Sequence, residues 1–187
     1  HDCPLRIKPV PCFHSCLEAL SILFRPIEAP VIAMKSKSVY LLLYGFTDAS
    51  GSGFRSSFLT KKGVRFRIGT WEKDAENNSS NWKEFENAVE ALEDEGKEGN
   101  LRGAMVFLAT DNSTVEGCLY KGNSPVKKLF ELVVRVKKLE LLYGCIILVT
   151  HISGDRMQAQ GTDGISRGIF KEGVSTGLDM LSFCPWH

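Results

Sequence analysis

The pattern of apolar residues changes near residue 38, where proline-rich, irregular sequence gives way to short apolar or alternating runs that are typical of strands. The pattern predicts three consecutive strands, Val39 to Phe46, Gly53 to Leu59 and Val64 to Trp71. The first is almost wholly apolar, which is typical of a strand covered on both faces. In the third, apolar residues alternate with Arg65 and Arg67, so we expect one of its faces to be wet. Short turns separate the three strands, which should form an antiparallel meander.

Helical periods then alternate with two further buried strands. Ser124 and Pro125 suit the start of a long helix, as its cap and first-turn residue. Strands joined through helices pair in parallel, so the sequence predicts an α/β fold with a mixed sheet and helices on its faces. The expected helices are Asn81 to Glu95, Ser113 to Tyr120 and Ser124 to Gly144, the expected strands are Ala104 to Thr110 and Cys145 to Thr150, and Asp74 to Ser80 should be a polar loop.

Proline content and periodicity divide the chain into three parts. Residues 1–37 hold five prolines around one helical stretch, Cys12 to Phe24, and we interpret them as an arm that connects to an upstream region. Residues 38–168 are expected to form the domain, and residues 169–187 a C-terminal tail. Hydrophobic residues make up 43% and charged residues 24%, which excludes a disordered chain. The chain opens with His1, so we interpret it as a segment of a longer polypeptide.

The apolar runs and the cysteines indicate in which cellular compartment the protein resides. The longest apolar run is far shorter than the roughly 20 residues that cross a bilayer, so we expect no membrane segment. The six cysteines are unevenly spaced and no export leader is visible, which favours free thiols inside the cell, in cytoplasm or nucleus. The less favoured alternative is a zinc site, which would lack the usual paired spacing, built from Cys3, Cys12, His14 and Cys16.

Acidic residues fall where an α/β sheet presents its ligands. Asp48 follows the first strand and Asp111 the fourth, so their carboxylates lie side by side if these strands are neighbours. Glu84 stands in the first turn of the Asn81 helix, on the side that can face the sheet, and Asp163 at the expected start of a last helix. Each alone has an ordinary explanation, as a turn cap, a helix cap or a partner of the helix dipole. The solvent side of the Asn81 helix is expected to carry Glu86, Glu90 and Glu93.

Taken together, the four acids indicate a metal site. Crowded carboxylates resist ionisation unless a cation neutralises them. Oxygen ligands without cysteine suit Mg²⁺ or Mn²⁺. Two such ions about 4 Å apart can activate a water and stabilise the leaving oxygen in phosphodiester cleavage. We therefore expect two ions at this edge of the sheet.

Four short segments carry a family likeness. They are Gly45-Phe46-Thr47-Asp48-Ala49-Ser50-Gly51, Ser79-Ser80-Asn81-Trp82-Lys83-Glu84-Phe85, Phe107-Leu108-Ala109-Thr110-Asp111-Asn112-Ser113 and Gly161-Thr162-Asp163-Gly164-Ile165-Ser166-Arg167. In this order they resemble the ribonuclease H domain of retroelement reverse transcriptases, over about Val39 to Gly168. The resemblance implies a ribonuclease H-like fold with a five-stranded mixed sheet of order 3-2-1-4-5. It also implies that residues 1–37 link the domain to a polymerase domain of the same polyprotein.

The resemblance further implies an activity, which is metal-dependent hydrolysis of the RNA strand of RNA–DNA hybrids. It implies two magnesium or manganese ions, and a mobile histidine that helps product release or proton transfer and corresponds to His151. A histidine that only orders its loop is the alternative. Arg55 stands where relatives tend to keep a small residue, which predicts a distorted second strand or an extra phosphate contact. The family's metal-binding acids fall on Asp48, Glu84, Asp111 and Asp163.

Charge is segregated along the chain although the formal net charge is +1. Residues 121–138 hold six basic side chains and one acidic, whereas residues 84–98 hold seven acidic and one basic. A basic helix beside an acidic pocket is suited to bind the phosphate backbone of a nucleic acid. The alternative is that these basic side chains only form the solvated face of a helix. A hybrid should be recognised by shape and by the 2′-hydroxyl. The candidate nucleic-acid-binding residues are Lys61, Lys62, Arg65, Arg67, Asn112, Lys127, Lys128 and Arg135.

Two other functions stay open at this point. The domain could be a catalytically inactive relic of a retroelement that binds nucleic acid or braces a polymerase, and salt-sensitive hybrid binding without cleavage would indicate this. It could also perform strand transfer on duplex DNA, as transposases and integrases do. The presence of all four acids in the family's order favours the nuclease.

Overall fold

The computed structural model of the chain describes residues 13–24, 41–162, 173, 179 and 180. Its strands are β1 (Leu41–Ala49), β2 (Gly53–Thr60), β3 (Gly63–Thr70), β4 (Ala104–Thr110) and β5 (Ile146–His151). Its helices are α1 (Phe13–Phe24), α2 (Lys73–Glu76), α3 (Ser80–Lys97), α4 (Ser113–Lys121), α5 (Lys127–Tyr143) and α6 (Gly154–Gln160). No helix in these ranges is long and apolar enough to cross a membrane.

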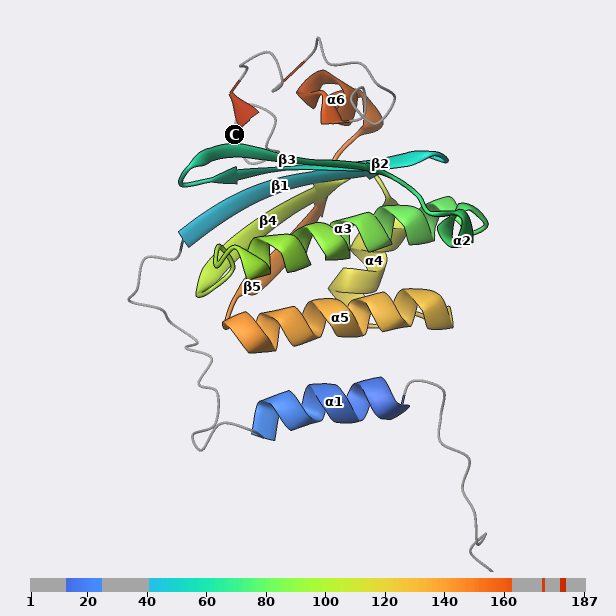
Figure 1. Cartoon of the computed structure of the whole chain (residues 1–187), viewed down its shortest axis with the longest axis vertical. Coiled ribbons are helices and arrows are strands. Elements are labelled where there is room, and N and C mark those ends of the chain that lie inside the picture. Colours follow the sequence, from blue (N-terminus) through green and yellow to red (C-terminus); the bar gives the residue numbers. More distant parts are fainter. Residues whose placement is uncertain (1–12, 25–40, 163–172, 174–178, 181–187) are drawn as a thin grey trace, which may run out of the picture.

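The strands form one mixed sheet of order β3-β2-β1-β4-β5. β1 pairs antiparallel with β2, and β2 with β3, as the meander predicted. β4 pairs parallel with both β1 and β5, because the connections between them pass through helices. The predicted strand order is confirmed (Figure 1).

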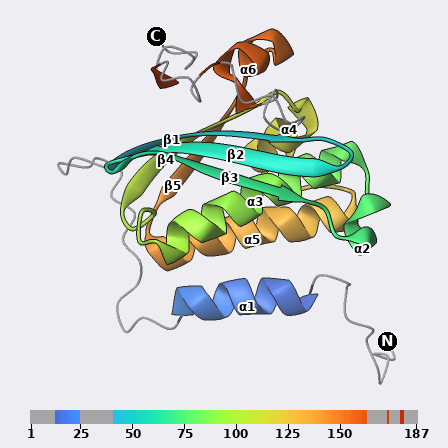
Figure 2. The same ribbon diagram turned by 45° about the horizontal axis from the view of Figure 1, so that its top comes forward.

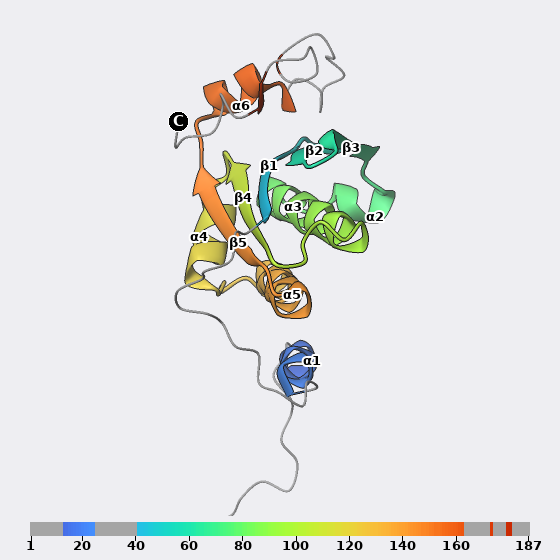
Figure 3. The same ribbon diagram turned by 90° about the vertical axis from the view of Figure 1, so that its left-hand side faces the viewer.

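Helices cover the two faces of the sheet unequally. α3, α4 and α5 lie on one face and α6 on the other, and α1 lies beyond α5, on which it packs (Figure 3). α3 and α5 run side by side beneath the strands (Figure 2). The main core lies between these helices and the sheet, with Leu43, Val106, Phe85 and Val133 at most 1% exposed. A smaller cluster under α6 consists of Phe46, Ala109, Ile152, Met157 and Met180.

The acidic face of α3 is paired, which corrects the expectation that it faces solvent. Arg135 of α5 donates to Glu86 and makes two bonds of 2.9 Å to Glu93. Glu86 is 8% exposed, and burial raises its pKa although the bond from Arg135 opposes this rise. Arg67 of β3 pairs with Glu90. α3 lies between β3 and α5, and each of these elements carries an arginine that pairs with carboxylates of α3. The acidic side of α3 is therefore neutralised within the fold.

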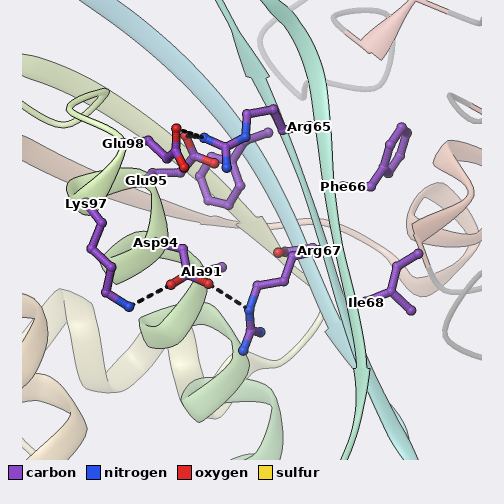
Figure 4. Close-up of a pocket in the computed structure, with 11 residues that line it drawn as sticks. Arg65, Phe66, Arg67, Ile68, Ala91, Asp94, Glu95, Lys97 and Glu98 are labelled. Carbon is purple, nitrogen blue, oxygen red and sulfur yellow. Dashed lines mark hydrogen bonds and ion pairs between the residues drawn. The ribbon is translucent and has the colours of Figure 1, made fainter.

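The two faces of β3 are also the reverse of the expectation. Arg65 and Arg67 point from β3 toward α3, whereas Phe66 and Ile68 point away from it (Figure 4). Phe66 is 42% and Ile68 56% exposed, so the apolar face of this edge strand is the wet one. The carboxylates of α3 attract the arginines to the inner face, and no described helix covers the outer face of β3.

Two local predictions were wrong, and one helix was not predicted. The expected loop at residues 74–80 includes most of α2, which begins at Lys73, and the first residue of α3. α5 begins at Lys127, because Ser124 lies in a preceding turn where its Oγ accepts from the amide of Val126 at 3.2 Å. α6, which Ser153 caps and which the burial of Met157 stabilises, lies after the last strand in a stretch for which no element was predicted.

The remaining expectations fall partly outside the described residues. The helical stretch expected at Cys12 to Phe24 is present as α1 from Phe13. Of the cysteines that are described, Cys16, Cys118 and Cys145 carry free thiols. Cys3 and Cys12 lie outside these ranges, so the zinc alternative stays a prediction, as do the arm and tail boundaries.

We expect Arg135→Ala to lower the free energy of unfolding by about 2–3 kcal/mol, because it leaves the carboxylates of Glu86 and Glu93 partly buried without their cation. Urea denaturation measures this. Lys137→Ala removes a comparable but more exposed pair with Glu140 and should cost no more than about 0.5 kcal/mol. Equal losses in the two variants would contradict the structural role of the α3–α5 pairing.

Candidate active site

Asp48 and Asp111 end neighbouring parallel strands. The register pairs Phe46 with Ala109, and its continuation by two residues sets Asp48 opposite Asp111. Asp48 is 7% exposed, and Asp111 is partly buried where the chain leaves β4. The carboxyl ends of parallel strands are where open α/β sheets bind ligands. The expected juxtaposition of these two acids is therefore present.

Glu84 joins these acids from the first turns of α3. Burial raises the pKa of Glu84 to about 7, and the negative charges of Asp111 and Asp48 act in the same direction. A hydrogen bond with Asn112 opposes the rise. The Oε2 atom of Glu84 is buried and accepts no hydrogen bond from any described residue. The charges of Asp48 and Asp111 thus both act on Glu84 at the carboxyl edge of the sheet.

Asn112 links the elements that carry the acids. Its Oδ1 caps α4 by accepting from the amides of Thr114 and Val115 at 2.9 and 3.1 Å. Its Nδ2 donates to Oδ1 of Asn81, at the start of α3, at 2.9 Å. The side chain expected to bind nucleic acid is thus engaged in holding α4 against α3.

His151 ends β5, the strand beside β4. Its ring Nε2 lies 3.0 Å from the carbonyl oxygen of Asp111, and its backbone amide donates to Glu116 at 3.1 Å. α6 begins nearby, since a Cβ atom on Gly154 would lie 3.8 Å from Oδ2 of Asp111. The imidazole is exposed and stands next to the acids.

Asp163 lies outside the described residues, but the chain is held up to the residue before it. Thr162 is 1% exposed and shares a hydrogen bond of 3.0 Å with the hydroxyl of Ser57 on β2. Gln160 donates to the same hydroxyl at 3.0 Å and accepts from the amide of Thr162 at 2.9 Å. Thr162 is therefore a buried anchor of the chain on β2.

Two residues next to the acids were missed by the sequence analysis. Lys83 is 5% exposed, and its Nζ donates to the carbonyl of Gly51 at 2.8 Å, which holds the β1–β2 turn against α3. Asn87 is fully buried and bonds to the backbone of Asp48. The available hint was the presence of Asn within a helix, where it is unfavourable unless its side chain has a specific partner.

Arg55 differs from its expectation. β2 is regular there, with Arg55 opposite both Asp48 and Ile68, so the second strand is not distorted. The side chain is 0% exposed, and burial lowers the pKa of Arg55 to about 10. A direct phosphate contact is therefore excluded in this conformation. Arg55 is therefore a buried residue of β2, opposite Asp48 in the register.

The candidate nucleic-acid-binding residues separate into two groups. Arg65, Arg67 and Arg135 are paired with carboxylates of α3, so they do not form the free basic patch that the sequence predicted. Among these candidates, the lysines carry the exposed positive charge. Lys128 donates to Asn78 at 2.6 Å, near the start of α3, and Lys127 lies 3.7 Å from Glu131. The exposed lysines of the prediction are Lys61, Lys62, Lys127 and Lys128.

A cavity of about 440 Å³ opens between β3 and the C-terminal half of α3 (Figure 4). None of the acids at the carboxyl edge of the sheet lines it, so this cavity is separate from the candidate site. Its charged lining consists of Arg65, Arg67, Asp94, Glu95, Lys97 and Glu98.

The residues at the carboxyl edge fit a hard divalent cation. Within the described ranges, no three His, Cys, Asp or Glu side chains are grouped closely enough to hold one ion. The donors are nevertheless of the right kind, because all are carboxylate oxygens and one of them, Oε2 of Glu84, is buried without a hydrogen-bond partner among the described residues. A cation would also relieve the repulsion that contributes to the raised pKa of Glu84.

We expect the metal-free domain to lose stability as pH rises from about 4.5 to about 7. In that window the unfolded chain releases the proton of Glu84 while the folded chain keeps it. Because Glu84 is partly exposed, the loss should be roughly 1–3 kcal/mol. Glu84→Gln should remove this pH dependence and be the more stable protein at pH 8 in chelator, as measured by urea unfolding. A wild-type slope that persists in Glu84→Gln would show that another group titrates.

Comparisons with known proteins support the fold. The sequence matches no protein-family model and no curated protein. Ribonuclease H1 of the archaeon Halobacterium salinarum NRC-1 superposes with a TM-score of 0.51 and 17% identity, over 63% of this chain and 89% of that one. The N-terminal RNase H domain of a Mycobacterium tuberculosis protein gives 0.50 and 15%, over 64% and 92%. LC11-RNase H1, isolated from compost by a metagenomic approach, gives 0.50 and 15%, over 70% and 94%. Together with the strand order, these superpositions show that the chain has a ribonuclease H-like fold.

Proposed function

We propose that this domain is a metal-dependent endonuclease that hydrolyses the RNA strand of RNA–DNA hybrids. The carrying observation is the convergence of Asp48, Glu84 and Asp111 at the carboxyl edge of a ribonuclease H-like sheet. The three superposed ribonuclease H proteins support the fold on which the proposal rests. The four motif segments support the assignment of roles within that fold.

Magnesium or manganese would be held by these carboxylates together with Asp163, which the resemblance adds. When bound, such ions activate a water and stabilise the leaving oxygen of a phosphodiester. The chain's own part is to bring these carboxylates to one edge of the sheet, partly shielded from water. Lys83 and Asn112 contribute by joining the β1–β2 turn and α4 to α3.

His151 is suited to move a proton at this edge. The carbonyl of Asp111 can only accept, so the neutral ring donates from Nε2. Nδ1 then carries the lone pair and can accept a proton from solvent or substrate. The exposed position of the ring allows exchange with water after each turnover.

In this proposal, exposed lysines bind the phosphates of the substrate, and the shape of the hybrid's groove is recognised. Lys128 lies near the start of α3, on the side of the molecule where Glu84 stands, and Lys61 and Lys62 occupy the exposed β2–β3 turn. A lysine that approaches a phosphate acts as a point charge without sequence preference. Recognition of the hybrid would then depend on the minor groove and the 2′-hydroxyl.

The motifs also support a context. We infer that the domain belongs to a retroelement reverse transcriptase, in which residues 1–37 lead from a polymerase domain of the same polyprotein to a nuclease domain at residues 38–168. It would act inside the cell, where such hybrids are made.

Cleavage of a labelled RNA–DNA hybrid tests the activity. Wild-type protein should degrade only the RNA strand with Mg²⁺ or Mn²⁺ and be inactive in chelator. Asp48→Asn and Asp111→Asn should each lower the rate by at least about a hundredfold, because a lost carboxylate weakens the hold on the ions. Glu72→Gln makes the same change of charge at an exposed residue just before α2 and should keep full activity.

Full cleavage by Asp111→Asn would overturn the site. Salt-sensitive hybrid binding by a wild-type protein that never cleaves would instead indicate the inactive binding module, and activity on duplex DNA would indicate strand transfer. The paired arginines weaken the case for a module that only binds, because they remove three of the expected basic contacts.

We expect His151→Ala to lower kcat by about a hundredfold with KM nearly unchanged, because a positioned proton carrier is lost. His151→Gln is the matched control, since its amide can still donate to the carbonyl of Asp111 but cannot carry a proton at neutral pH. Steady-state kinetics with and without added imidazole measure both. Imidazole should restore part of the rate to His151→Ala. Full activity in His151→Gln would show that the histidine only orders its loop.

A further inference from the structure

Asn87 makes a set of hydrogen bonds that joins α3 to three strands at once. It is 0% exposed. Its Nδ2 donates to the carbonyl of Asp48 at 2.8 Å and to the carbonyl of Arg55 at 2.6 Å. Its Oδ1 accepts from Nη1 of Arg67 at 2.9 Å. A single amide thus contacts β1, β2 and β3 at the point where β1 presents Asp48.

The orientation of this amide is determined by Arg67. A guanidinium can only donate, so the atom that faces it must be the amide oxygen, and the nitrogen must face the two carbonyls. Arg67 is itself held, by Glu90 and by Asp94, with 3.1 Å between Nε of Arg67 and Oδ2 of Asp94. Both hydrogens of the amide nitrogen are therefore used, and a reversed amide would set its oxygen against two carbonyl oxygens.

The position of Asn87 relates it to the candidate site. It follows Glu84 by three residues on α3, so the two side chains leave the same side of the helix. Nδ2 of Asn87 bonds to the backbone of Asp48, and Glu84 lies near enough to Asp48 for the charge of that residue to act on it. The distance between the carboxylates of Asp48 and Glu84 therefore depends on how α3 is held at Asn87.

We infer that Asn87 is a positioning residue, which sets the separation of Asp48 and Glu84 needed to hold a divalent cation. The inference rests on the proposed function. It predicts an effect on the binding of the cation that a loss of stability alone would not produce. Groups that orient metal ligands typically change metal affinity or activity by about 10–100-fold when they are removed.

The test compares Asn87→Ala and Asn87→Ser with Asn100→Ala. Asn100 follows α3 at its other end and makes one side-chain bond, of 2.6 Å to Glu95, so its loss weakens the helix away from the acids. The probe is MgCl₂ alone, and the readout is the magnesium-dependent rise in melting temperature. Amide hydrogen exchange across residues 47–56 and the magnesium dependence of hybrid cleavage complete the set.

In both Asn87 variants, the magnesium concentration that gives half of the maximal rise in melting temperature should increase by at least about tenfold. The magnesium concentration for half-maximal cleavage should increase to the same extent. Exchange at residues 47–56 should become at least about tenfold faster than in Asn100→Ala at matched global stability. Asn100→Ala should keep the wild-type magnesium dependence. If Asn87→Ala does not fold, Arg67→Met supplies the second test, because it keeps Asn87 but frees its amide to reverse, and it should shift the magnesium dependence in the same direction.

Wild-type magnesium dependence in a folded Asn87 or Arg67 variant would overturn the positioning role alone. Unchanged exchange at residues 47–56 would overturn it as well. A wild-type protein that neither responds to magnesium nor cleaves would overturn the proposed function, and with it this inference, so the two failures are distinguishable.

Discussion

The parallel pairing of β1 with β4 is the constraint on which the rest of the structure depends. Parallel neighbours cannot be joined by a hairpin, so the chain must return from the carboxyl edge of the sheet to the amino edge before β4 begins. α3 makes that return, which requires its first turns to lie at the carboxyl edge. Asp48, Asp111 and Glu84 are therefore brought to one edge by topology, before any contact between their side chains is considered.

A second constraint follows, because α3 carries many carboxylates and yet packs on both sides. Its apolar residues contact the sheet, and its acids meet Arg67 on β3 and Arg135 on α5. Carboxylates buried in this way are stable only with a paired cation. Arg67 and Arg135 are used to hold the helix, and the candidate nucleic-acid-binding residues that stay exposed are lysines such as Lys61 and Lys128.

The surroundings of the acids combine rigidity with repulsion. Asn87, Lys83 and Asn112 hold the backbones of β1, the β1–β2 turn and α4 against α3. Held at this edge, the carboxyl of Glu84 is shielded from water near two other acids, which raises its pKa. A site built this way stores unfavourable electrostatic energy that a cation would release, at a cost in stability to the empty domain.

The sequence by itself determined the five strands, the long helices and the placement of Asp48, Glu84 and Asp111, because these follow from local periods and from the rules for joining parallel strands. The full sheet order, which the structure confirms, was what the resemblance to ribonuclease H domains implied. Only the tertiary structure decided the partners of charged and polar groups. Asn87 bonds to residues 32 and 39 positions away, and Arg135 to residues 42 and 49 positions away. Periodicity shows that a helix has a polar side but not which element packs against it. For the same reason the wet face of β3 was assigned to Arg65 and Arg67, although distant carboxylates attract both to the inner face.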